Sequence, residues 1–365
     1  MSLLRILIFP LTIVLVSGFA ISTVSSDLAD LTSSCAKTNG GSFHILGPIL
    51  GQFLCGIVTF FKLILSDPEG SHFLAVFLSF VAGLVTIVCL ESARVANQAH
   101  RVIKYPTPAL MMVNIVGGLV VFPLVLCPAF LLKSQNEQRL VPTVTAEGAS
   151  VISETTPLIR ALPLTDRHVL SVAEMYSIPL SVFLGFIVPS ITLFLHPNNE
   201  VLIALWQLFP VYVATLRYIS RAVLLRTVPH LCVNNVHVES DNVGLLCVYG
   251  APSVVSLLTH LLYVWHALAP SSGVPDPQVH AALHVLVVDF WAIALTMLYW
   301  LWFEGGIRPA TSALLASLIA GPGAGICVGW IMREEQKVQL SRYMSGARST
   351  ESNTGQAPTE EISES

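Results

Sequence analysis

Charged side chains are scarce in this sequence, and their scarcity excludes an ordinary soluble domain. Asp, Glu, Lys and Arg make up 11% of the 365 residues, whereas soluble domains carry roughly 25%. Apolar residues reach 54%, and the mean hydropathy is +0.73. Because so few charges cannot solvate the surface of a chain this long, we expect an integral membrane protein. The formal net charge of −4 argues against a nucleic-acid partner, which would require basic patches.

Motifs that hold metals and cofactors are missing as well. The sequence has no paired acidic motif for magnesium diphosphate, no Walker motif, no GxSxG and no CxxC. His280 and His284 have HxxxH spacing, but the further histidine boxes of membrane desaturases and hydroxylases do not accompany them. We therefore expect any chemistry to rely on carboxyl groups and the shape of a cavity, with no metal and no cofactor.

Cysteine offers no framework of disulfides. Only Cys35 and Cys232 lie in polar stretches, so at most one disulfide is expected. The other five lie inside apolar runs and are expected to act as small hydrophobic residues: Cys55, Cys89, Cys127, Cys247 and Cys327.

Long apolar runs, by contrast, are abundant. A helix needs about 20 apolar residues to cross the hydrocarbon, and the runs predict an all-α, polytopic transmembrane helical bundle with eight or nine spans. The chain divides into an N-terminal helix at 1–25, a membrane helical bundle at 26–332 and a disordered polar tail at 333–365. The first helix is either a retained transmembrane helix or signal anchor, which we favour, or a cleaved signal peptide. The predicted spans are residues 4–25, 45–65, 72–91, 108–132, 172–195, 201–219, 243–269, 280–303 and 309–332.

The packing and the orientation of these helices are less well determined. Gly47 with Gly51, and Gly325 with Gly329, have the GxxxG spacing that suits close helix packing, although chance explains such pairs equally well. Across nine spans, Lys and Arg divide about ten to eight between the two sides, which is too even for the positive-inside rule. No orientation follows from the sequence.

The segment after the third predicted span carries polar side chains at helical spacing. It is either an amphipathic helix end among the lipid headgroups or a polar cover over a cavity. In the second case Glu91 pairs with Arg94, and Asn97 faces the cavity with them. If the helix continues, five side chains share one face: Glu91, Arg94, Gln98, Arg101 and Tyr105.

A single carboxyl, that of Asp289, falls in the middle of the predicted span 280–303. An ionised side chain there costs roughly 2.5–3.5 kcal/mol on insertion scales, so desolvation favours the protonated acid. Asp289 is either a structural residue hydrogen-bonded to a neighbouring helix or a proton donor. As a donor, we expect it to share one interior cavity with Glu91, Arg94 and Asn97.

Aromatic side chains gather near the ends of the predicted spans, and Arg217 and Arg221 follow one of them. The arginines are expected to reach the interface, and an interfacial belt accounts for most of the aromatic residues. Three of them are candidates to bind a substrate whose carbocation the ring faces stabilise: Trp206, Tyr299 and Trp300.

Two stretches, ESARVANQ at 91–98 and LWQLFP at 205–210, resemble fungal integral-membrane terpene cyclases of meroterpenoid pathways, of the ascofuranone and macrophorin type. The resemblance extends over most of residues 40–332. It implies a multi-pass protein of the endoplasmic reticulum that binds a hydrophobic prenylated substrate and works beside other enzymes of its pathway. The better-known members use two acidic residues, which Glu91 and Asp289 would match, with Arg94 beside Glu91.

The reaction implied by this resemblance is a cyclising isomerisation of a farnesyl chain on an aromatic or cyclohexanoid head group. A carboxyl group protonates a terminal epoxide or olefin, and the double bonds close in sequence. A base then removes the last proton, or an internal hydroxyl traps the cation. No diphosphate is released. The alternative is a small-molecule or proton-coupled membrane transporter, in which Asp289 would relay protons or face the substrate as a counter-ion.

Overall fold

The computed structural model describes residues 3–25, 40–94, 97–98, 100–140, 170–232, 235–236, 242–268 and 276–336, with isolated residues between 29 and 37. Helices make up nearly all of this part of the chain, which confirms the predicted all-α, polytopic class. Among the described residues the exception is a two-residue antiparallel pair, β1 (Leu170–Ser171) with β2 (Asn235–Val236), which follows α15 (Pro229–Cys232).

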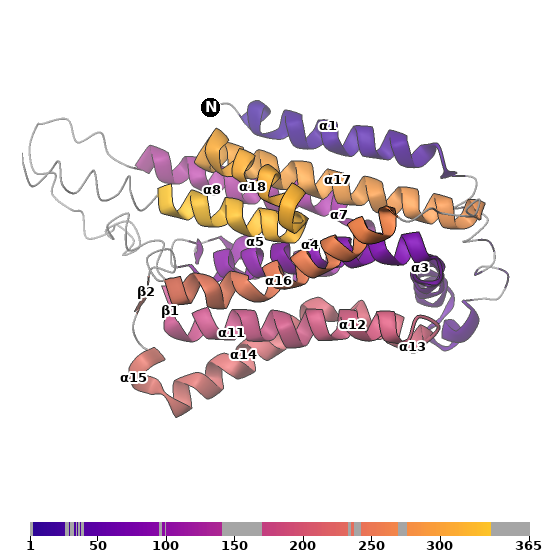
Figure 1. The fold of residues 1–365 in the computed structure, drawn as a ribbon, viewed down its shortest axis with the longest axis horizontal. Helices are drawn as coiled ribbons and strands as arrows, with labels where there is room; N and C mark the ends of the chain where they lie inside the picture. The colour runs from indigo at the N-terminus through magenta and orange to yellow at the C-terminus, as the bar shows by residue number, and fades with distance from the viewer. Residues whose placement is uncertain are drawn as a thin grey trace, which may run out of the picture.

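The long helices lie side by side along one axis, as Figure 1 shows. α1 runs antiparallel to α17, since Phe9 stacks on Tyr299 near one end. At the other end, His284 contacts the carbonyl of Ala20. We call the end at which α4 and α17 begin the disulfide end, and the end at which they finish the charged end. The helices along this axis are α1 (Leu3–Ser22), α4 (Pro68–Ala93), α11 (Val172–Val182) continued by η4 (Phe183–Ile187) and α12 (Val188–Leu195), α14 (Phe209–Thr227), α16 (Asn242–Ala267) and α17 (Pro277–Gly305).

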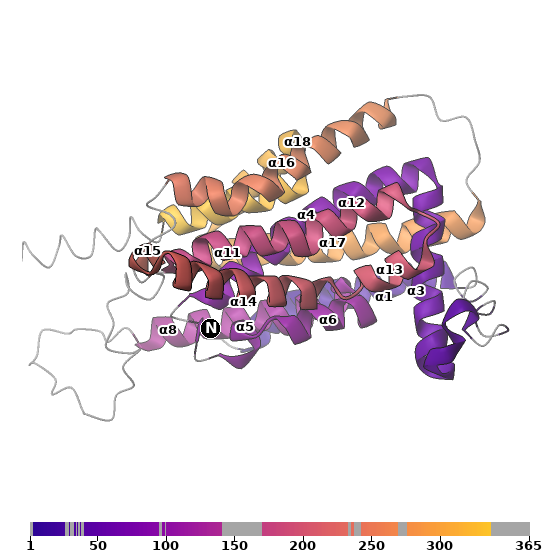
Figure 2. The ribbon, with the colours of Figure 1, turned by 90° about the horizontal axis from the view of Figure 1, so that it is seen from below.

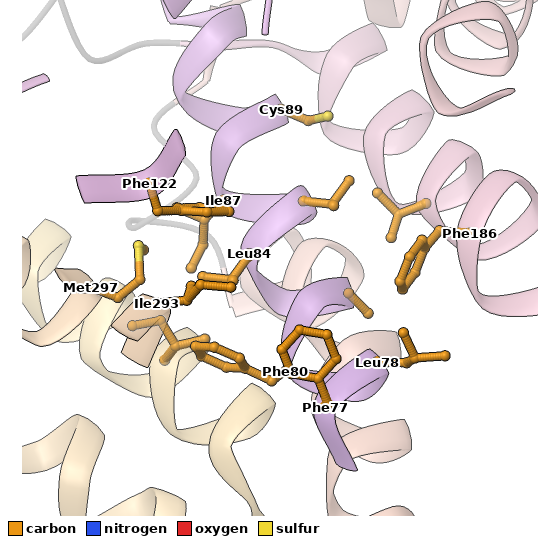
Figure 3. Packing of buried hydrophobic residues seen from close by; sticks show 14 of the residues in the cluster. Phe77, Leu78, Phe80, Leu84, Ile87, Cys89, Phe122, Phe186, Ile293 and Met297 are labelled. Atoms are coloured by element: carbon orange, nitrogen blue, oxygen red, sulfur yellow. The ribbon is translucent and has the colours of Figure 1, made fainter. Parts of the chain in front are cut away.

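α4 is the central helix of the bundle. Asp67 caps its start by accepting the N–H of Gly70 at 2.7 Å. Apolar side chains then cover its whole circumference, and 83% of the residues in its most apolar stretch are buried. Figure 3 shows these side chains pointing on one side to Ile293 and Met297 of α17, and on the other to Phe186 of η4. The apolar core therefore surrounds α4, and α4 carries Glu91 to the charged end.

The number of helices that can cross a membrane is smaller than the sequence predicts. Among the described residues, five helices are long and apolar enough, and a sixth span forms if α13 (Glu200–Trp206) and α14, which meet at 59°, are taken as one bent span. Eight or nine spans are therefore not confirmed. The shortfall lies mainly in the predicted spans 108–132 and 309–332, because each is broken at a glycine into shorter helices.

One of the five long helices, α3 (Pro48–Ser66), lies across the disulfide end of the bundle. Figures 1 and 2 both show it crossing the direction of the other helices. It contacts α13 and α17, and Lys62 binds Glu200 at 2.8 Å. The preceding short helix η1 (Gly41–Leu46) packs closely on Gly51, where a Cβ would lie 2.7 Å from the carbonyl oxygen of Phe43. An apolar run of sufficient length is thus no proof of a span.

The predicted span 108–132 forms a helical hairpin that enters and leaves the bundle at the charged end. The chain runs inward along α6 and turns at Gly117, whose φ of +88° favours glycine. It then returns, because Phe130 of α8 stacks on Trp300 near the end of α17, and α8 contacts α5, which precedes α6. We call α6 to α8 the first hairpin. Its elements, with α5, are α5 (Arg101–Lys104), α6 (Thr107–Val116), α7 (Gly118–Val121), η3 (Phe122–Leu126) and α8 (Cys127–Leu140).

The predicted span 309–332 forms a second hairpin at the same end. α18 (Ile307–Ala320) runs inward to Gly321, which has a φ of +86°, and a helix at 322–336 returns beside it. A Cβ at Gly329 would lie 2.6 Å from the Cβ of Ala313, so the two arms touch. Of the two explanations left open for the pair at 325 and 329, the structure therefore supports close helix packing. We call residues 307–336 the second hairpin.

The second hairpin gives a test of this packing. Gly325→Ala is expected to lower the free energy of unfolding by about 1–3 kcal/mol, because the new Cβ would lie 2.5 Å from the carbonyl oxygen of Ala313. Gly56→Ala in α3 is the control, since nothing lies within 4 Å of its Cβ position and alanine there should stabilise the helix by roughly 0.5–1 kcal/mol. Thermal unfolding in detergent measures both, and equal midpoints would contradict the packing.

The disulfide differs from the sequence-based expectation. Cys35 pairs with Cys55, so the prediction that Cys55 is only a small hydrophobic residue was wrong. Cys55 can reach Cys35 because α3 lies across the end of the bundle, and one face of α3 is therefore turned to the polar segment that contains Cys35. Cys89, Cys127 and Cys327 are free and buried, as expected.

The boundary of the predicted tail is also corrected. The helix at 322–336 passes through residue 333, and the side chains of Arg333 and Glu334 are each only 3% exposed. They belong to the folded bundle. The rest of the tail, 337–365, and residues 141–169 of the long internal loop lie outside the described residues.

Candidate functional site

Five charged side chains meet in a buried cluster at the charged end. Each is at most 4% exposed. Two come from the end of α4, one from the end of α17 and two from the second hairpin. We call this set the charged cluster: Glu91, Arg94, Glu304, Arg333 and Glu334.

Salt bridges connect every member of the charged cluster. Arg94 Nη1 lies 2.7 Å from Glu334 Oε2, and Arg333 Nη1 lies 3.2 Å from Glu91 Oε1. Arg333 also binds both Glu304 and Glu334. A buried charge is tolerated only when it is paired, so the cluster fastens the second hairpin to the ends of α4 and α17.

The predicted grouping of Glu91, Arg94 and Asn97 is present, but the helix that was expected to carry it ends early. α4 stops at Ala93, and the chain turns so that Asn97 Nδ2 reaches back to Glu91 Oε2 at 3.0 Å. Glu91 also accepts a hydrogen bond from Trp330 Nε1 at 3.2 Å. Helical spacing alone brings Glu91 and Arg94 together, whereas Asn97 reaches Glu91 only because the chain turns after α4.

Asp289 lies far from this grouping. It precedes Glu304 by 15 residues on the same helix, a rise of about 22 Å. Its Oδ1 accepts the N–H of Leu119 at 2.6 Å, at the start of the returning arm of the first hairpin. A Cβ at Gly118 would lie 3.4 Å from its Oδ2. Asp289 therefore caps the hairpin tip, and the expectation that it shares one cavity with Glu91 is not met.

The three aromatic candidates are also dispersed. Trp300 lies near the charged cluster, where its Nε1 donates to Glu304 at 2.9 Å. Trp206 is buried at the end of α13 and donates to Ser190 at 3.0 Å. Tyr299 stacks on Phe9 of α1. No common pocket brings the three rings together in the part of the chain that the structure describes.

A cavity of about 450 Å³ opens beside the charged cluster, on the other face of α4. Its volume is within the range of small-molecule sites, roughly 300–1,000 Å³. We call it the charged-end cavity. Its polar wall is formed by Ser92, Gln98, Lys104, Tyr105, Glu174, Arg217, Tyr218 and Arg221, and its apolar wall includes Leu110, Val213 and Ala214.

The carboxyl of this cavity is Glu174, which the sequence reasoning missed. Arg217 Nε holds its Oε2 at 2.7 Å, and Arg221 lies 3.2 Å from its Oε1. Arg217 also donates to Ser92 Oγ at 2.7 Å, next to Glu91 on α4. The sequence feature that could have pointed to Glu174 is a capping box, Ser171-x-x-Glu174, at the start of α11. The structure thus gives Arg217 a carboxylate partner inside the protein.

Chemically, the charged-end cavity combines a carboxyl group with hydroxyl and cationic donors beside an apolar wall. The two guanidinium groups fix the position of this carboxylate, and a positioned carboxyl group is one of the side chains that transfer protons in catalysis. Among the described residues, no group of three or more His, Cys, Asp or Glu side chains is arranged to hold a metal ion.

The comparisons with known proteins include a match to a protein-family model. No curated protein and no solved structure matches the chain. The model of the CtvD domain matches residues 35–297, which is more than two thirds of the chain. The match includes Glu91, Glu174 and Asp289 and ends before the second hairpin. The chain therefore belongs to the CtvD family, which is associated with fungal meroterpenoid pathways.

Proposed function

We propose that this protein is a membrane-bound terpene cyclase that closes the farnesyl chain of a meroterpenoid, started by protonation of an epoxide or an olefin. The observation that carries the proposal is the charged-end cavity, where Glu174 and Arg217 face an apolar wall. Membership of a family tied to fungal meroterpenoid pathways supports it. The cavity supports this substrate class, since an amphiphile with a polar head and a hydrocarbon chain would match both walls.

Two carboxyl groups divide the proton transfers in this proposal. The first hairpin extends from the charged-end cavity to Asp289. Its Leu110 lines the cavity. Gly117, about 10 Å further along the same helical arm, lies next to Asp289. Asp289 gives a proton to the far end of the prenyl chain, and Glu174 removes one after ring closure. One proton enters and one leaves, so the product is an isomer of the substrate. An apolar surrounding excludes the water that would trap the cation.

The activity is tested with microsomes that contain the full chain and a farnesylated phenol bearing a terminal epoxide. We expect a product of unchanged mass and a new ring pattern, identified by mass spectrometry and NMR. Glu174→Gln should slow its formation by about 10²-fold, the lower range for a lost acid or base. Glu69→Gln is the matched control, because Glu69 is exposed at the disulfide end. Unchanged substrate with well-folded protein would refute the cyclase.

A transporter is the second candidate, and a specific observation favours it. The bent pair α13–α14 and the tips of both hairpins are discontinuous helices inside the bundle, and such helices form the binding sites of many secondary transporters. The same microsomes distinguish the two functions. A transporter would accumulate the unconverted phenol inside the vesicles, whereas a cyclase converts it.

The proposal places the protein in the endoplasmic reticulum with the charged-end cavity toward the cytosol. Of the basic side chains that the structure describes, Lys37 and Lys62 lie at the disulfide end, and those toward the charged end are Arg94, Arg101, Lys104, Lys133, Arg217, Arg221, Arg226, Arg308 and Arg333. Nine basic side chains at the charged end against two at the disulfide end agree with a cytosolic charged end, by the positive-inside rule. The Cys35–Cys55 disulfide requires an oxidising compartment such as the lumen at the opposite end.

Cysteine labelling tests this orientation. In sealed microsomes, a membrane-impermeant maleimide should label Glu335→Cys at the charged end above the level of the parent chain. Glu69→Cys at the disulfide end should be labelled only after permeabilisation. Both positions are exposed, so access depends on the side of the membrane. The reverse pattern would overturn the orientation.

A further inference from the structure

Positive charge exceeds negative charge in the charged-end cavity. Its lining includes three cationic side chains, Lys104, Arg217 and Arg221, and a single carboxylate, that of Glu174. Arg217 and Arg221 share this carboxylate. The wall therefore has a surplus of two positive charges.

Lys104 contributes the clearest part of this surplus. Its ammonium lies 5.2 Å from the ring centroid of Tyr105. No carboxylate of the described residues lies within salt-bridge distance of it. A cation in a partly desolvated wall is stabilised by an anion that completes the pair.

The polar and apolar walls give the ligand a direction. Tyr105 and Tyr218 are exposed at the mouth, where their hydroxyl groups add hydrogen-bond donors to the three cations. Leu110, Val213 and Ala214 form the apolar part. An oxyanion would therefore bind among Lys104 and Arg221, with the hydrocarbon chain directed along the first hairpin.

We infer that the charged-end cavity binds its substrate through an acidic head group, a carboxylate or an ionised phenol, seated on Lys104 and Arg221. This inference rests on the proposed function and adds to it the chemical class of the head group. Lys104 and Arg221 then bind and position the substrate, and Glu174 keeps its role in proton transfer.

Binding to the purified full-length protein in non-ionic detergent tests the inference. The probes are a farnesylated dihydroxybenzoic acid and its methyl ester, which differ in the charge of the head group, and calorimetry measures both dissociation constants. We expect the acid to bind about tenfold more tightly, the effect of one charge-assisted hydrogen bond. Lys104→Gln should remove most of this preference. Arg226→Gln should leave it unchanged, because Arg226 is exposed on α14 and does not line the cavity.

The possible outcomes separate the inference from the cyclase. Equal binding of acid and ester overturns the acidic head group and leaves the cyclase standing. A preference that survives in Lys104→Gln and in Lys104→Gln/Arg221→Gln also overturns it, because the anion then binds elsewhere. Displacement of the acid by an anionic phospholipid at similar concentration means that the site takes lipid headgroups, and the inference fails. Selective binding of the acid without any conversion supports the inference and refutes the cyclase.

Discussion

Arg333→Gln is expected to lower the free energy of unfolding by roughly 3–5 kcal/mol, the cost of removing one partner from a buried salt bridge. Arg333 binds the carboxylates of Glu91, Glu304 and Glu334, and its guanidinium lies 4.4 Å from the ring centroid of Trp330. Glutamine keeps hydrogen-bonding groups but brings no charge. Arg94 would still pair with Glu91 and Glu334, but one buried positive charge would be lost from beside the three carboxylates.

Fluorescence-detected size exclusion and thermal unfolding in detergent measure this effect. Arg308→Gln is the matched control, because Arg308 is exposed at the same end of the bundle. If Arg333→Gln does not fold at all, the milder Glu334→Gln removes one acceptor and should still lower the midpoint. Glu335→Gln, an exposed neighbour, should not. Equal midpoints for Arg333→Gln and Arg308→Gln would show that the charged cluster contributes nothing to stability.

The helical class was predictable because it depends on composition, whereas the hairpins were not. Hydropathy measures the length of an apolar run, and the runs at 108–132 and 309–332 are long enough to cross. Their tips are nevertheless visible in the sequence as Gly117-Gly118 and Gly321-Pro322. What the sequence did not contain was the partner that stabilises a turn inside the bundle. For the first hairpin that partner is Asp289, 170 residues further along the chain.

The missed hairpins also explain why orientation could not be derived from the sequence. Treating each hairpin as a single span reverses the side assigned to every loop that follows, so basic residues were divided almost evenly. With both hairpins returning to the charged end, Lys62 and Arg308 fall on opposite sides and the charge bias becomes clear.

The candidate site was predictable only where its residues are neighbours in sequence. Glu91 and Arg94 share a helix face at a spacing of three, and they do meet at 3.3 Å. Arg333 joins them from 242 residues away, and no local pattern marks such a contact. Glu174 and Arg217 meet through the packing of α11 against α14, which spacing cannot show.

Asp289→Asn is expected to reduce cyclisation by roughly 10⁴-fold, the upper range for a lost general acid, while the protein remains folded. The asparagine oxygen can still accept the N–H of Leu119, so the tip of the first hairpin keeps its cap. The amide has no acidic proton to give to an epoxide. Product formation in microsomes and the midpoint of thermal unfolding measure these two properties separately.

Asp289→Leu separates the cap from the acid. Leucine removes the acceptor and leaves the N–H of Leu119 without a partner inside the bundle, which costs several kcal/mol, so both folding and product should be lost. His284→Ala is the control, because His284 faces away and contacts only the carbonyl of Ala20 among its described polar partners. If Asp289→Asn forms product at the normal rate while Asp289→Leu does not fold, Asp289 serves only as the cap. The starting proton must then come from a group near the charged-end cavity, where Glu174 is the carboxyl in contact with the substrate space.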